Sequence, residues 1–94
     1  GAAGDVEGGL AAIRESLRLD PSSAWAYVVL ADLLERKGQH LDALRAAEDG
    51  LRRDPTDEVL LNRKAWVEYQ LGRSEAALGT TAAGLRLHPN SAML

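Results

Sequence analysis

A period of 34 residues constrains the fold of this chain more than any other feature. Pro21, Pro55 and Pro89 are spaced 34 residues apart. Four other columns keep one residue type at this spacing: Gly4/Gly38/Gly72, Leu10/Leu44/Leu78, Leu17/Leu51/Leu85 and Arg18/Arg52/Arg86. A fixed period of about 20–50 residues is typical of arrays in which each structural unit covers the apolar face of its neighbour. We therefore expect a stack of similar units.

The prolines divide the 94 residues into one partial copy and two complete copies. The copies run over 1–23, 24–57 and 58–91, and residues 92–94 begin a fourth. A chain of this length has room for one hydrophobic core, so we expect a single domain. Because the first copy lacks its front part, the sequence has the look of a piece cut from a longer array.

Each copy reads as a helix, a turn and a second helix. Ser22, Thr56 and Asn90 follow the prolines as candidate N-caps, since their side chains can bind free N–H groups. Gly38 and Gly72 lie where the first helix should stop, because glycine adopts the left-handed conformation that closes a helix. We expect five helices and no strand. The second helix of each copy is expected at about 6–20, 41–53 and 75–87.

Bulky and small side chains alternate in one pattern over the copy at 24–57. The residues that carry it are Tyr27, Leu30, Ala31, Leu34, Gly38, Ala43, Ala47, Gly50 and Pro55. This pattern resembles the tetratricopeptide repeat. The copy at 58–91 keeps much of it but has Lys64 and Glu68 where the family buries apolar side chains. The resemblance implies an all-α fold, in which helix-turn-helix repeats of 34 residues form a short right-handed α-solenoid.

Composition and motifs argue against catalysis. The chain has no Cys, which excludes a disulfide framework, Cys-ligated zinc and thiol chemistry. His40 and His88 each lack a second His at ligand spacing, so they read as solvated residues near helix ends. The sequence contains neither a glycine-rich nucleotide loop nor a serine nucleophile motif. We therefore expect no enzyme activity, no metal and no cofactor.

Charge and hydropathy narrow the choice of partner. A net charge of −3 argues against a general nucleic-acid binder, which should be basic. The most apolar run, residues 24–31, is far shorter than the roughly 20 residues that span a bilayer. The first residues do not resemble a signal peptide, which favours the cytoplasm. A protein or peptide remains as the expected partner.

The resemblance further implies a concave surface lined by the first helix of each repeat. The matching residues are Trp25, Val28, Asp32, Glu35 and Arg36 in one copy and Val59, Asn62, Trp66, Tyr69 and Gln70 in the next. Aromatic side chains offer large contact area at low entropic cost, and the carboxylates of Asp32 and Glu35 favour a basic group. We expect this surface to bind a partner segment with an apolar and a basic anchor. The family's carboxylate clamp is not expected, because Val28 and Asp32 replace its Lys and Asn.

Lys64 and Glu68 leave a second orientation of the first helix of copy 58–91 open. Both fall on the face that should be buried, where an ion pair is costly. A rotated helix would instead turn Trp66 and Tyr69 towards the core. The sequence therefore places these two aromatics either in the groove or in the core.

The ends of the array suggest other functions. Leu10, Ile13 and Leu17 at one end and Leu78 and Leu85 at the other are expected to lack a covering helix. Self-association through these ends or through the groove is therefore one alternative to partner binding. The other alternative is that the repeats form the interaction portion of a larger regulator or enzyme.

Overall fold

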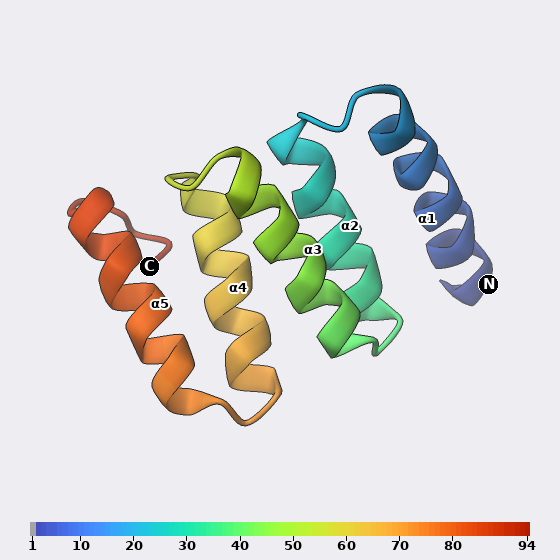
Figure 1. Cartoon of the computed structure of the whole chain (residues 1–94). Helices are drawn as coiled ribbons and strands as arrows, with labels where there is room; N and C mark the ends of the chain where they lie inside the picture. Colours follow the sequence, from blue (N-terminus) through green and yellow to red (C-terminus); the bar gives the residue numbers. More distant parts are fainter. Residues whose placement is uncertain (1) are drawn as a thin grey trace.

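Five antiparallel helices form a row in chain order in the computed structural model, which describes residues 2–94 (Figure 1). They are α1 (Ala2–Leu19), α2 (Ala24–Arg36), α3 (His40–Arg53), α4 (Glu58–Gln70) and α5 (Ser74–Leu87). Each helix packs against the next, and α4 also reaches back to α2. The expected all-α repeat architecture of five helices is confirmed, and residues 2–94 contain no strand.

The first helices of the two complete copies begin one residue later than expected. Ser23 and Asp57 cap α2 and α4, each by accepting a hydrogen bond from the N–H three residues on. The Ser22 hydroxyl instead donates to the Asp20 carboxylate over 2.6 Å, and Thr56 makes the corresponding bond in its own Asp-Pro turn. The expected caps Ser22 and Thr56 are therefore wrong, because these hydroxyls stabilise the preceding turn.

Asn90 is likewise not a cap. Its neighbour Ser91 accepts a hydrogen bond from the N–H of Leu94 over 3.1 Å. Ser91 thus holds the same place as Ser23 and Asp57, at the same 34-residue spacing. The capping geometry repeats in all three copies, although residues 88–94 form turns and not a helix.

Glycine ends both first helices, as expected. Gly38 has φ of 82° and Gly72 has φ of 77°, a backbone region open mainly to glycine. Around Gly38, the N–H of Gln39 donates to the Leu34 carbonyl, and the N–H of Gly38 donates to the Glu35 carbonyl. This pair of bonds satisfies carbonyls that the helix end leaves free.

Small residues let the central helices approach closely. Ala31 on α2 and Ala43 and Ala47 on α3 are fully buried. Gly50 of α3 is the tightest contact, since a Cβ there would lie 2.8 Å from Leu60 Cδ1 and from Tyr27 Cβ. Bulky side chains of one helix therefore fill gaps on another, which is the packing that the small-residue stripe predicts.

The two ends of the row are covered differently. Leu10, expected to be exposed, is buried, while Ile13 and Leu17 are half-buried. The expectation is wrong for Leu10 because α1 turns this stripe towards α2, its neighbour in the row. At the other end Leu78 and Leu85 are exposed, as expected.

Polar contacts accommodate the two charged residues on the buried side of α4. Glu68 is buried and accepts a hydrogen bond of 2.5 Å from the Thr80 hydroxyl of α5. Lys64 is half-buried, with its ammonium 3.9 Å from a carboxylate oxygen of Glu48 on α3. The rotated orientation is not adopted: Leu60 and Val67 fill the core, and both aromatics of α4 remain on the surface.

Candidate functional site

The ten residues proposed from the sequence, called here the α2/α4 face, differ in how much surface they offer. Trp25, Tyr69 and Trp66 are 70%, 62% and 49% exposed. Arg36 and Gln70 are exposed, and Asp32, Glu35, Val59 and Asn62 are half-buried. Val28 is buried in a cluster with Tyr27 and Leu60. The aromatic members therefore present most of the apolar surface.

The three aromatic side chains form two separate apolar spots. Trp66 and Tyr69 stack, with ring centroids 6.3 Å apart and planes at 28°. Both lie in the second half of α4, whereas Trp25 lies in the first turn of α2. A ligand that touched all three aromatics would therefore extend along both helices.

Trp66 and Tyr69 also form one wall of a hollow that we call the α4/α5 groove. Its volume is about 590 Å³. The lining residues are Asn62, Ala65, Trp66 and Tyr69 of α4 and Ser74, Ala77, Leu78 and Thr81 of α5. Most of them are apolar, as in sites that take an apolar anchor. Only Asn62, Trp66 and Tyr69 were identified from the sequence; the α5 wall was missed, although Leu78 belongs to a repeating column.

The carboxylates of the α2/α4 face already have partners within the chain. Asp32 lies 3.2 Å from Arg36 Nε and 3.5 Å from the Arg63 guanidinium. A Glu35 oxygen lies 2.7 Å from Nδ1 of His40. A basic ligand group would have to compete with these cations, so its gain in binding free energy is smaller than that of a free acidic edge.

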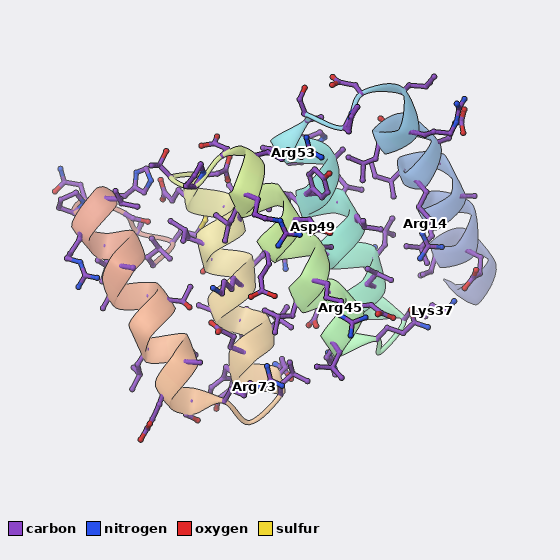
Figure 2. All side chains as sticks on the ribbon, viewed as in Figure 1. Arg14, Lys37, Arg45, Asp49, Arg53 and Arg73 are labelled. Atoms are coloured by element: carbon purple, nitrogen blue, oxygen red, sulfur yellow. The ribbon has the colours of Figure 1, made fainter. Side chains whose placement is uncertain are left out.

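The outer side of α3 is a charged surface of mixed sign. Figure 2 shows Arg45, Asp49 and Arg53 in a row along this helix. Arg45 lies 3.8 Å from Asp42, and Asp49 pairs with Arg52 one turn on. Pairs at this spacing stabilise a solvated helix surface and do not mark a binding site.

The chemical groups that catalysis or metal binding requires are dispersed. Within the part of the chain that the structure describes, no three His, Cys, Asp or Glu side chains gather to hold a metal ion. His88 bonds through Nε2 to the Thr56 carbonyl over 2.5 Å, and His40 pairs with Glu35. Both histidines therefore serve contacts near helix ends. No helix over residues 2–94 has the length and apolarity to cross a bilayer.

Two comparisons with known proteins agree with this architecture. A family model of the tetratricopeptide repeat matches residues 12–45, a stretch of one period. The TPR repeat-containing protein YpiA of Bacillus subtilis (strain 168) is 29% identical over 87 residues. That alignment covers 93% of this chain but 21% of YpiA, so the chain spans about a fifth of its relative's length.

Proposed function

Because the chain belongs to the tetratricopeptide repeat family, whose repeats generally mediate protein–protein interaction, we propose that it binds a partner segment on its α2/α4 face. The repeats at 24–57 and 58–91, within one domain over 1–94, are the units of this proposal. The family is typically a non-catalytic interaction module, so the role proposed is recognition without chemistry.

Exposed aromatic surface is the observation that carries the proposal. A folded chain gains stability by burying Trp and Tyr, yet Trp25, Trp66 and Tyr69 are at least half open to solvent. Side chains of this kind often dominate binding, with losses of about 2 kcal/mol or more on truncation to Ala. Their position on the face implied by the family resemblance favours binding there.

The chemistry of the face specifies the partner segment. Its main anchor is an apolar side chain on the stacked rings of Trp66 and Tyr69. A basic group binds beside Asp32 and displaces the exposed guanidinium of Arg36 from that carboxylate. Since this exchange replaces one exposed ion pair with another, the apolar anchor contributes more binding free energy than the basic one.

Selection from a displayed peptide library tests this function. Peptides enriched on the intact chain should contain an apolar residue near a Lys or Arg. Their affinity should fall at least about tenfold with the double variant Trp66→Ala and Tyr69→Ala. Leu19→Ala is the matched control, because Leu19 is an exposed apolar residue on α1, remote from the face. Equal binding by the double variant and the control would contradict the proposal.

Self-association is the second candidate, favoured by the exposure of Leu78 and Leu85 on the last helix. The same double variant separates the two functions. If the face binds a partner, Trp66→Ala with Tyr69→Ala abolishes capture and leaves the sedimentation coefficient unchanged. If the face joins copies of the chain, the double variant changes the sedimentation coefficient instead.

A further inference from the structure

The α4/α5 groove has an occupied counterpart within the same chain. Subtracting 34 from each of its lining residues gives the corresponding surface of α2 and α3. That surface consists of Val28, Ala31, Asp32 and Glu35 of α2 and His40, Ala43, Leu44 and Ala47 of α3. We call it the α2/α3 groove. Helix α4 packs against both of these helices, so the chain itself shows what such a groove accepts.

Helix α4 fills the α2/α3 groove with one apolar edge. Leu60 rests on Gly50, where a Cβ would lie 2.8 Å from its Cδ1 atom. Val67 is fully buried in a cluster with Ala31 and Ala43. Together with the partly buried Leu71, these side chains follow the spacing of one helix face. The occupant is thus an amphipathic helix that presents its apolar edge.

Two cations of α4 find carboxylates at the borders of the α2/α3 groove. Arg63 lies 3.5 Å from Asp32 of α2. Lys64, whose place in the sequence is between Leu60 and Val67 on the packed edge, lies 3.9 Å from Glu48 of α3. The charge pattern of the bound helix therefore matches the groove that holds it.

The α4/α5 groove keeps the apolar floor but loses both carboxylates. Ala65, Ala77 and Leu78 repeat Ala31, Ala43 and Leu44. Trp66 replaces Asp32, and Ala82 replaces Glu48. An Arg or Lys at these points would lose its water without gaining a partner, which is costly. The open groove therefore favours a helix with apolar side chains where α4 carries Arg63 and Lys64.

The first anchor point of the α4/α5 groove is already taken. Leu94 lies on Gly84 as Leu60 lies on Gly50, so that a Cβ at Gly84 would lie 2.6 Å from Leu94 Cδ1. Ser91 fixes this turn by accepting the Leu94 N–H and by donating to Glu58 over 2.5 Å. The remainder, between Tyr69 and Leu78, is open.

We propose that the α4/α5 groove binds an amphipathic helix of a partner protein, laid along it as α4 lies on the α2/α3 groove. Its anchors are aliphatic side chains at positions i, i+3 and i+7, which match Lys64, Val67 and Leu71 of α4. No Arg or Lys stands at the positions that match Arg63 and Lys64. This inference deepens the proposed function, on which it rests, by naming a helix as the partner segment.

A peptide derived from α4 provides the probe. It has the sequence of residues 57–71 with Leu60→Ala, Arg63→Ala and Lys64→Leu, and it carries a fluorescein label. The first change removes the anchor that Leu94 already supplies, and the other two remove the unmatched cations. Fluorescence anisotropy of the probe with the intact chain should show saturable binding. A second peptide that retains Arg63 and Lys64 should bind at least about tenfold more weakly.

Variants of the chain locate the binding site. Leu78→Glu should raise the Kd of the probe at least about tenfold. Leu19→Glu is the matched control, because Leu19 is 70% exposed and Leu78 is 71% exposed, and it should bind as the parent does. Thr81→Lys, elsewhere on the groove wall, is a second blocking variant. Circular dichroism confirms that each variant retains its helices.

Separate variants distinguish failure of this inference from failure of the proposed function. Trp25→Ala and Asp32→Ala alter the α2/α4 face outside the groove and should leave probe binding unchanged. Equal probe binding by Leu78→Glu and Leu19→Glu would overturn the helix site, even if library peptides still depended on Trp66 and Tyr69. A concentration-dependent dimer that Leu78→Glu dissolves would also overturn it, because a second copy would then occupy the groove.

Discussion

The α2/α3 groove and the α4/α5 groove have similar walls but opposite exposure. Leu44 is 6% exposed under α4, whereas Leu78, at the same repeat position, is 71% exposed. The wall itself does not decide this difference, because both residues are leucines on equivalent helices. Burial in a repeat array depends on the neighbouring helix, so one residue type stabilises the fold in one copy and offers a binding surface in the next.

The polar residues around the two grooves diverge in a consistent direction. Asp32 and Glu48 bind cations of α4, while Trp66 and Ala82 stand at their places in the next copy. The covered groove thus carries charges that orient a helix of this chain, and the open groove carries an aromatic ring. This difference teaches that the open groove is specialised for another occupant and is not simply an unfilled copy.

The largest expected difference between the grooves follows from shortening their leucines. Leu44→Ala removes packed methyl groups and leaves a cavity under α4, so the free energy of unfolding should fall by about 2–5 kcal/mol. Leu78→Ala removes only exposed surface, and its effect should stay within about 0.5 kcal/mol. Urea unfolding followed by circular dichroism measures both. Similar losses for the two variants would show that Leu78 is covered in solution.

Adding a methyl group to each floor glycine comes next. A Cβ at Gly50 meets Leu60 and Tyr27 at 2.8 Å, so Gly50→Ala should cost about 1–3 kcal/mol through overpacking. A Cβ at Gly84 meets the Leu94 side chain, which can move aside at little cost. Gly84→Ala should therefore be neutral or stabilise by up to about 1 kcal/mol through helix propensity. Thermal unfolding of both variants checks the opposite signs.

A smaller difference is expected at the Asp32 and Trp66 positions. Asp32→Ala breaks half-exposed ion pairs with Arg36 and Arg63, so the free energy of unfolding should fall by less than about 1 kcal/mol. Trp66→Ala should leave stability nearly unchanged and weaken ligand binding. Measuring unfolding and probe binding on both variants tests this division. A large loss of stability in Trp66→Ala would place its ring in the core.

The smallest effect is expected on the outer surface of α1, which no groove involves. The Arg18 guanidinium hydrogen-bonds to Glu15 and holds the pKa of that carboxyl below its ordinary value of 4.5. The resulting stabilisation is present above the ordinary pKa and is lost as pH falls through the lowered one. Arg18→Ala should raise the pKa of Glu15, as an NMR titration would show. No change in that pKa would contradict the pairing.

Much of the fold was predictable because local signals agree with the period. The positive φ of Gly38 and Gly72 follows from their place after an amphipathic stretch. The N-caps were missed by one residue because Ser22 and Ser23 are both capping residues, and only the Asp20 carboxylate decides between them. Pattern alone does not rank two such neighbours.

The candidate site was less predictable than the fold. The exposure of Trp66 depends on how Glu68 is accommodated, and the Thr80 hydroxyl that binds this carboxylate belongs to another helix. Leu10 was misjudged because its covering helix follows it in the chain and does not precede it. The α5 wall was missed because Leu78 reads as a core residue. In each case the deciding contact lies outside the local sequence.

Fluorescence quenching of Trp66 tests most directly whether the α4/α5 groove is open and binds a helix. Trp25→Phe leaves Trp66 as the sole tryptophan, and sedimentation establishes that the sample is monomeric. We predict that acrylamide quenches Trp66 readily in the free chain and that saturating helical probe, prepared with its own tryptophan changed to Gln, reduces this quenching. A strongly shielded Trp66 in the free monomer, or quenching that the probe leaves unchanged, would contradict the account.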